Sequence, residues 1–162
     1  MARQKHLYIL RHAKAEKGWP GLPDIDRPLH PIGVEETNRI ARMFSSSTPP
    51  PELVICSPAV RTFSTALITC RVIGYEASSI RLDGRIYEAR LSDLFRVLAD
   101  VEDHVKSVLM VGHNPSVTDL VNTFSNNVNH MKTGSLFGFG FDCPSWSEIE
   151  FSDAVKVRAF EP

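Results

Sequence analysis

The sequence predicts a three-layer α/β/α sandwich with a mostly parallel central sheet. Five or six apolar runs rich in Val, Ile, Leu and Phe alternate with amphipathic segments, which is the pattern of α/β proteins. A chain of 162 residues, of which 43% are hydrophobic, is long enough to form one domain with a sizeable core. We therefore expect a single domain over residues 1–162.

Residues 1–74 predict two strands and two helices. The expected strands are residues 6–10 and 52–56, and the expected helices are residues 33–44 and 59–73. The first strand, "HLYIL", is uniformly apolar, as in a strand buried on both faces of a sheet. In the first helix, Val34, Ala41 and Phe44 recur at helical spacing. Gly74 stands where a glycine commonly ends a helix.

Residues 75–162 predict a further alternation of strands and helices. The expected strands are residues 79–89, 107–112, 135–141 and 154–160, and the expected helices are residues 92–101 and 115–124. Ser92 is expected to cap the first of these helices. In "SLFGFGF", three phenylalanines share one face, whereas Gly138 and Gly140 leave the other face bare, which predicts the close approach of a helix.

Composition excludes several function classes. The formal net charge is −1, so no global basic field favours nucleic acid. Cys56, Cys70 and Cys143 show no CxxC spacing, which indicates neither a disulfide framework nor a zinc site. No apolar run reaches the roughly 18 residues that span a bilayer, and the first strand starts too early for a signal segment. We expect an unprocessed cytoplasmic protein that binds neither nucleic acid nor membranes.

Three of the predicted strands end in polar residues of the same kind. The first ends in Arg11-His12, the second in Ser57 with Arg61 one turn later, and the strand at 107–112 in His113. Ligands of an open α/β sheet bind at the carboxyl ends of its parallel strands. The start of a helix also favours anions, through free N–H groups and the macrodipole. The sequence therefore predicts one anion site that contains two arginines and two histidines.

A phosphoryl group is the anion that these side chains fit best. Guanidinium groups bind phosphate oxygens bidentately and stay charged at every physiological pH. A histidine among arginines should have a low pKa, which leaves His12 neutral and able to attack phosphorus. Each motif alone also fits a solvated loop, a capped helix start or a turn, so the prediction depends on their conjunction.

The other histidines are assigned no role at this site. His6, His104 and His130 are expected to serve surface or core packing. His30 precedes Pro31, where a helix cap is expected, and is interpreted as structural.

An ordered series of motifs surrounds the predicted site residues. The series is "LYILRHAKAE", "DIDRPLHPIG", "ICSPAVRTFSTA", "IYEA", "MVGHNP" and "KTGSLFGFGFDCPSW". Arg-His alone is common, whereas this order of motifs is specific. It resembles the histidine phosphatase superfamily, with its phosphoglycerate-mutase-like fold, and within it the small SixA-like phosphohistidine phosphatases. The resemblance covers almost the whole chain.

The resemblance implies phosphoryl transfer without a cofactor or a metal. His12 would attack phosphorus in line, and water would hydrolyse the resulting phosphohistidine. Arg11, Arg61 and His113 would bind the phosphoryl oxygens, and we add Ser57 to this phosphate-binding set. Phosphate, sulfate or vanadate is then expected to inhibit.

The chain departs from the family pattern at several positions. Ala13 and Lys14 follow Arg-His where many relatives carry a glycine and a downstream asparagine, and His30 replaces a Thr or Ser. Larger members insert a helical cap and a glutamate general acid, but the stretch here is too short for a cap. Glu88 is the carboxylate in that stretch with a suitable position for a general acid. A site without a cap suits a phosphate displayed on a protein or a small unselective phosphoester.

Other functions stay open on the sequence alone. The preferred substrate is phosphohistidine or another phosphoprotein. A small-molecule phosphomonoesterase or mutase is the alternative of the same class, although a mutase must exclude water from its phosphoenzyme. A module that binds phosphorylated partners without turnover is the alternative from another class. A histidine metal site is disfavoured because the arginines would repel a divalent ion.

Overall fold

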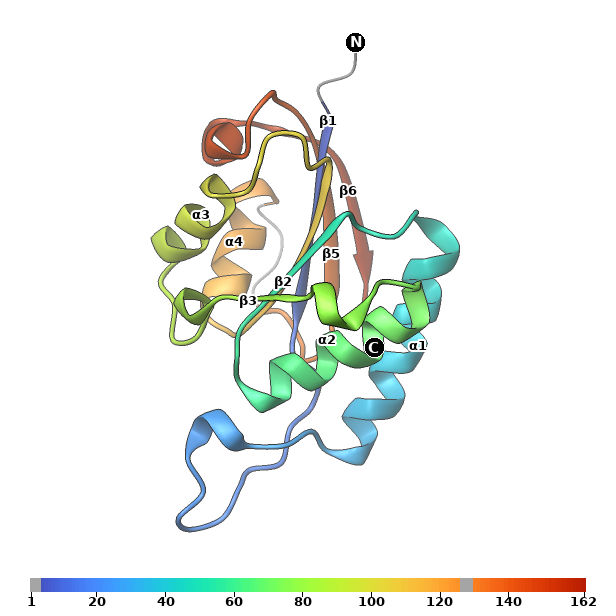
Figure 1. The fold of residues 1–162 in the computed structure, drawn as a ribbon, viewed down its shortest axis with the longest axis vertical. Coiled ribbons are helices and arrows are strands. Elements are labelled where there is room, and N and C mark those ends of the chain that lie inside the picture. The colour runs from blue at the N-terminus through green and yellow to red at the C-terminus, as the bar shows by residue number, and fades with distance from the viewer. Residues whose placement is uncertain (1–3, 126–129) are drawn as a thin grey trace.

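The computed structural model of the protein describes residues 4–125 and 130–162, which form one six-stranded sheet (Figure 1). Its strands are β1 (Gln4–Arg11), β2 (Leu53–Cys56), β3 (Arg81–Leu82), β4 (Ser107–Gly112), β5 (Leu136–Asp142) and β6 (Ala154–Phe160). They lie in the order β3-β2-β4-β1-β5-β6. The first four strands pair in parallel, and β5 and β6 are antiparallel to their neighbours. The prediction of a mostly parallel sheet is therefore confirmed.

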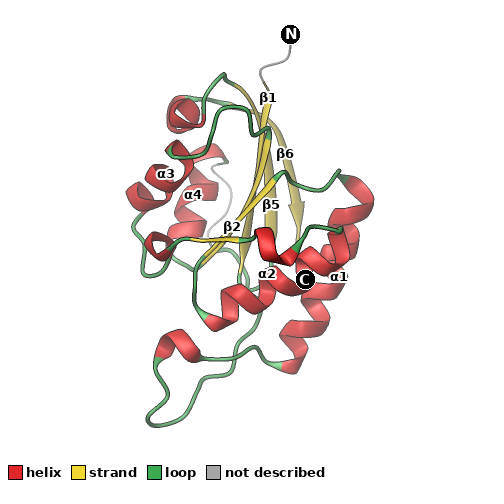
Figure 2. Cartoon of the chain, viewed as in Figure 1, coloured by secondary structure: helices red, strands yellow, loops and turns green. Residues whose placement is uncertain are grey.

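Helices cover both faces of this sheet, which gives the predicted three layers (Figure 2). The α-helices are α1 (Pro31–Ser47), α2 (Val60–Ile73), α3 (Leu91–Ala99) and α4 (Ser116–Phe124). Short 3-10 helices are η1 (Asp24–Asp26), η2 (Ala77–Ser79), η3 (Gly84–Ile86) and η4 (Trp146–Phe151). Helices α1 and α2 lie on one face, and α3 and α4 lie on the other. Within the described ranges, no helix has the length and apolar character needed to cross a membrane.

Strand β1 divides the hydrophobic core into two clusters. Leu7 and Ile9 join the cluster beneath α3 and α4, whereas Tyr8 and Leu10 join the cluster beneath α1 and α2. Successive side chains of a strand point to opposite faces, so a strand covered on both sides must be apolar throughout. This explains why "HLYIL" shows no polar alternation.

Side-chain and backbone chemistry sets the helix ends. His30 caps α1, because its Nδ1 accepts a hydrogen bond from the Ile32 N–H at 3.0 Å. Gly74 ends α2 in the left-handed conformation, at a φ of 78°. Both predictions are confirmed. The prediction for α3 is wrong, because Arg90 and not Ser92 is the cap residue, and its N–H donates to the Asp93 carboxylate.

Two predictions about packing faces need correction. Val34 of α1 is exposed, because the buried stripe of this helix runs through Thr37, Ile40 and Phe44 instead. The bare side of β5 is covered at Gly138 by the ring of Tyr8 from β1 and not by a helix: a Cβ there would lie 2.8 Å from that ring.

Candidate active site

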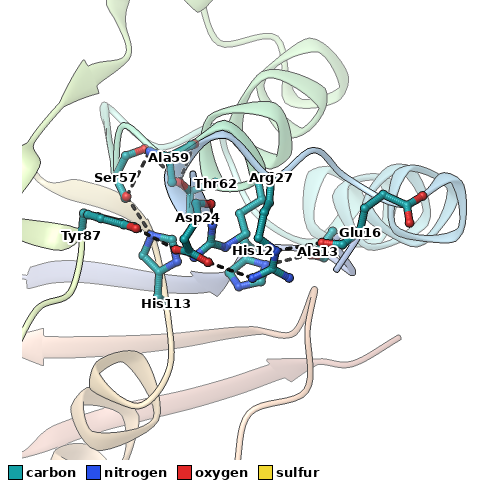
Figure 3. Close-up of polar contacts among 11 residues, drawn as sticks. His12, Ala13, Glu16, Asp24, Arg27, Ser57, Ala59, Thr62, Tyr87 and His113 are labelled. Carbon is teal, nitrogen blue, oxygen red and sulfur yellow. Dashed lines mark hydrogen bonds and ion pairs between the residues drawn. The ribbon is translucent and has the colours of Figure 1, made fainter. Parts of the chain in front are cut away.

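The carboxyl ends of β1, β2 and β4 bring the predicted histidines together. These three strands are neighbours in the sheet, and Arg11 at the end of β1 pairs with Gly112 at the end of β4. His12 and His113 follow directly, and their ring centroids lie 5.4 Å apart (Figure 3). Both side chains are buried. The sheet therefore places two histidines from distant parts of the chain at one point.

Backbone contacts fix the orientation of the His12 ring. Its Nδ1 lies 2.8 Å from the carbonyl oxygen of Ala13, which requires Nδ1 to carry the hydrogen and donate. The N–H of Ala13 in turn donates to Thr65 Oγ1 of α2 at 3.0 Å. Burial, together with the nearby charges of Arg61 and Arg11, lowers the pKa of His12 to about 4, although the hydrogen bond to Ala13 opposes this shift. At neutral pH the ring is uncharged, with a free lone pair on Nε2.

His113 is held by Ser57 at the end of β2. The Nε2 of His113 lies 2.8 Å from Ser57 Oγ, which also accepts a longer bond from the Ala59 N–H at 3.3 Å. Burial, with smaller contributions from charge on His12 and on Arg61, lowers the pKa of His113 to about 3. Because the ring is neutral and Ser57 can donate to Nε2, Nδ1 is free to carry the hydrogen. The hydroxyl of Ser57, which is predicted to bind phosphate, thus contacts His113.

Arg61 reaches the site from the first turn of α2 and is held by a carboxylate. Its guanidinium donates to the backbone oxygen of Asp24 at 2.8 Å and to Asp24 Oδ2 at 3.0 Å. The same Oδ2 accepts from the Tyr87 hydroxyl at 2.7 Å, and Oδ1 accepts from Arg27 at 3.0 Å. The hydrogen bond from Tyr87, with those from Arg27 and Arg61, holds the pKa of Asp24 well below its usual range. Asp24 is therefore a carboxylate that orients Arg61.

Arg11 ends β1, directly before His12. Its guanidinium donates to the Met131 carbonyl at 2.7 Å and lies 3.2 Å from His130 Nε2. Asn114 also donates to the Met131 carbonyl, at 3.1 Å. The assignment of His130 to packing alone is therefore wrong, because this histidine contacts an arginine of the site.

Several buried polar atoms of these residues have no hydrogen-bond partner among the described residues. In residues 4–125 and 130–162, the buried side-chain nitrogen and oxygen atoms without a hydrogen-bond partner are Arg11 Nε, Arg61 Nε, His113 Nδ1 and Ser135 Oγ. Buried polar atoms are almost always paired, because an unpaired one costs about 1–3 kcal/mol. Three of these atoms belong to the predicted phosphate-binding residues, and all three can donate. The arrangement is suited to an anion with several acceptor oxygens.

Glu88 is placed differently from the other predicted residues. It is exposed, and no hydrogen bond or ion pair joins it to any residue that the structure describes. Its backbone adopts a φ of 53°, which is unusual for a residue other than glycine. The preceding Tyr87 packs the edge of its ring on His113, with centroids 5.5 Å apart. Glu88 thus lies beside the site without touching the two histidines.

Four site residues escape prediction from the sequence. These are Asp24, Arg27, Thr65 and Tyr87. Asp24 and Arg27 belong to the "DIDRPL" motif and Tyr87 to "IYEA", so the motifs contain these residues but do not predict their contacts. Among the described residues, no group of three or more His, Cys, Asp or Glu side chains is arranged to hold a metal ion.

The curated relatives of the chain include uncharacterized proteins from bacteria and a plant. No protein-family model matches the chain. An uncharacterized protein of Mycobacterium tuberculosis (strain H37Rv) is 33% identical over 112 residues, which cover 68% of this chain and 66% of the relative. The match thus spans just under two thirds of that relative's length. An uncharacterized chloroplastic protein of Arabidopsis thaliana is 25% identical over 155 residues, covering 89% of this chain and 70% of the relative.

Solved structures identify the fold. A crystal structure from Agrobacterium tumefaciens, assigned as the phosphohistidine phosphatase SixA, is 26% identical, with a TM-score of 0.78 over 96% of this chain and 98% of that one. A Nakamurella protein assigned as SixA has a TM-score of 0.82 at 23% identity, over 96% and 95% of the two chains. SixA complexed with tungstate has a TM-score of 0.79 at 21% identity, over 95% and 96%. The chain therefore shares the fold of the SixA phosphohistidine phosphatases, and its Arg11, His12, Arg61 and His113 converge at the strand ends of that fold.

Proposed function

We propose that residues 1–162 act as one phosphatase domain that hydrolyses phosphohistidine or another phosphoprotein through a covalent intermediate on His12. The observation that carries this proposal is the set of unpartnered donors around His12: Arg11 Nε, Arg61 Nε and His113 Nδ1. A tetrahedral phosphoryl group offers acceptor oxygens in several directions and satisfies such donors together. The solved relatives assigned as SixA, and the one complexed with tungstate, support the same conclusion.

The first step uses the lone pair on His12 Nε2. This lone pair attacks phosphorus in line, the N–P bond forms, and the bond to the leaving group breaks with its electron pair. The hydrogen bond from Nδ1 to the Ala13 carbonyl holds the ring in the orientation and tautomer that attack requires. Because the pKa of His12 is about 4, the nucleophile needs no prior deprotonation at neutral pH.

The second step returns the enzyme to its resting state. A water molecule attacks phosphorus, the N–P bond breaks with its electron pair returning to Nε2, and inorganic phosphate leaves. In both steps the charge on the phosphoryl oxygens is stabilised by the positive charges of Arg11 and Arg61 and by the N–H that neutral His113 donates. Ser57 acts in this mechanism by orienting His113 through its Nε2.

The need to protonate the leaving group determines which class of substrate the site can hydrolyse. Glu88 is the candidate general acid, and its left-handed backbone is the kind of strain found at functional sites. Phosphohistidine places little demand on this residue, because its imidazole is protonated by solvent and leaves readily. Between α2 and β4 the longest helix is α3, which packs into the core cluster on one face of the sheet and so does not form a helical cap over the site. A phosphate displayed on a protein can therefore approach His12.

Trapping the intermediate tests the proposal. The protein is incubated without added metal with phosphohistidine, phosphoserine and p-nitrophenyl phosphate, and bound phosphate is measured after quenching in acid or in alkali. We expect turnover of phosphohistidine and a phosphoenzyme that survives alkali and is lost in acid. His12→Ala should abolish both while the thermal unfolding transition is retained. Substantial turnover by His12→Ala would exclude the covalent mechanism, and phosphate binding by wild type without any turnover would favour a recognition module.

A further inference from the structure

The segment between β1 and α1 forms an ordered loop that projects from the molecule beside the active site. Figure 1 shows it in blue, extending beyond the carboxyl ends of the parallel strands. Backbone hydrogen bonds close it as a hairpin, from Glu16 N to Pro28 O at 2.9 Å and from His30 N to Lys14 O at 2.9 Å. The side chain of Arg27 adds a bond to the Glu16 carbonyl at 2.8 Å. The loop is therefore a fixed element, able to present side chains in defined positions.

The outer part of this loop presents a tryptophan to solvent. Trp19 is 60% exposed, whereas the other tryptophan of the chain, Trp146, is 1% exposed and lies in the core. A tryptophan offers a large rigid apolar surface with a polar N–H at its edge, and for this reason tryptophan is enriched at protein interfaces. The Leu22 N–H donates to the Trp19 carbonyl at 3.0 Å, so the backbone at this position is held in a turn.

Two lysines line a groove together with the tryptophan. Lys14 and Lys17 are exposed, and with Trp19 and His30 they line a groove of about 550 Å³. Glu16 is the acidic residue among those that line it. The groove thus combines one flat apolar surface with an excess of lysine charge, which is complementary to an acidic partner.

A chain of contacts links this groove to the phosphate-binding residues. Gly18 lies against the stem of Arg27, since a Cβ at Gly18 would be 3.4 Å from Arg27 Cγ. The guanidinium of Arg27 bonds to Asp24, and Asp24 holds Arg61. The positive charge of Arg27 also contributes to the low pKa of His12. A molecule with its phosphoryl group on His12 would have to be larger than a simple phosphoester to contact Trp19 as well.

We propose that Trp19, Lys14 and Lys17 form a docking surface for the protein that carries the phosphoryl group, and that this protein is acidic around its phosphorylated residue. The inference rests on the proposed phosphatase activity and specifies its substrate. Tryptophan is enriched among the residues that dominate protein interfaces, because it buries a large rigid surface. The lysines would attract the acidic partner and raise its association rate. Small phosphoesters would end at the arginines and leave the docking surface unused.

The test compares a protein substrate with a small one. An acidic folded protein and a basic folded protein are each phosphorylated on histidine with phosphoramidate, and kcat/KM is measured for both and for p-nitrophenyl phosphate. The variants are Trp19→Ala and the double variant Lys14→Ala/Lys17→Ala. Phe151→Ala is the matched control, because Phe151 is 83% exposed in η4, near the amino-terminal end of β1 and away from the site.

We expect Trp19→Ala to lower kcat/KM for the acidic phosphoprotein at least tenfold, mainly through KM, and to leave p-nitrophenyl phosphate hydrolysis unchanged. Wild type should prefer the acidic over the basic phosphoprotein, and this preference should weaken with added salt and in the double lysine variant. Phe151→Ala should behave as wild type on every substrate.

Two outcomes would overturn the docking surface while leaving the phosphatase intact. One is wild-type activity of Trp19→Ala on the acidic phosphoprotein. The other is an equal loss on p-nitrophenyl phosphate, which would show damage to the site and not to docking. Absence of turnover by wild type on all substrates would instead contradict the proposed function, so the two failures are distinguishable.

Discussion

The carboxylate of Asp24, in the loop after β1, holds the guanidinium of Arg61, at the start of α2, through a bond of 3.0 Å that is supported by a second bond to the Asp24 carbonyl at 2.8 Å. These bonds take the two terminal nitrogens of Arg61 and leave its Nε for a ligand. Asp24 is thus a positioning residue, which acts on a phosphoryl group through Arg61.

We predict that Asp24→Asn lowers kcat/KM about tenfold, the scale of one charge-assisted hydrogen bond of about 1.5 kcal/mol. A positioning role predicts more than a loss of activity. In an Arg61→Ala background, Asp24→Asn should have almost no further effect, because the group that Asp24 orients is gone. Kinetics of the two single variants and the double variant measure this coupling, and additive losses would show that Asp24 acts independently of Arg61.

Arg61 itself should dominate the affinity for phosphate analogues. Arg61→Ala is expected to weaken competitive inhibition by vanadate or sulfate by about 1.5–3 kcal/mol, the range for hydrogen bonds to charged groups, which is roughly ten- to a hundredfold in inhibition constant. Arg71→Ala is the matched control, since Arg71 is exposed in the last turn of the same helix. An inhibition constant that Arg61→Ala leaves unchanged would place Arg61 outside the site.

The two buried histidines should make the protein less stable as the pH falls. Burial lowers their pKa values to about 4 for His12 and about 3 for His113, from the ordinary 6.5. Below pH 6.5 the unfolded chain binds protons at both positions and the folded chain does not, so the free energy of unfolding decreases with decreasing pH. The loss continues to about pH 4 for His12 and pH 3 for His113, with up to about 1.4 kcal/mol per pH unit for each.

Urea unfolding at several pH values between 7 and 4 measures this effect. His12→Ala removes one of the two titrating groups, so it should reduce the dependence of stability on pH over this range. A His12→Ala protein with the same pH dependence as wild type would contradict the low pKa of His12.

Leaving-group chemistry tests Glu88. An alkyl phosphate expels a poor alkoxide and gains about a hundredfold or more from a general acid, whereas phosphohistidine and activated aryl phosphates do not need one. If Glu88 donates that proton, Glu88→Gln should slow alkyl phosphates far more than phosphohistidine. Glu35→Gln, at an exposed position of α1, is the matched control. An equal, small effect on every substrate would remove Glu88 from the mechanism and strengthen the phosphohistidine assignment.

Local patterns in the sequence determine the order of the elements and the edge of the sheet at which the site lies. An apolar run that ends in Arg11-His12 predicts both a buried strand and the direction in which the next side chains leave it. The carboxyl ends of neighbouring parallel strands must meet, so the sequence by itself places Arg61 and His113 with His12. His30 and Gly74 are predictable for a similar reason, because helix ends depend on residues close in the chain.

Tertiary structure alone decides how these residues are held. Asp24 reaches Arg61 across 37 positions of the chain, and Tyr87 reaches Asp24 across 63. Both depend on irregular segments, whose contacts follow no repeating period that a sequence could show. The same holds for Ser57, whose hydroxyl orients His113, and for His130, which lies beside Arg11. Strand and helix patterns are properties of residues close in the chain. The contacts that hold the site residues in place form only when segments that are distant in the chain come together in the fold.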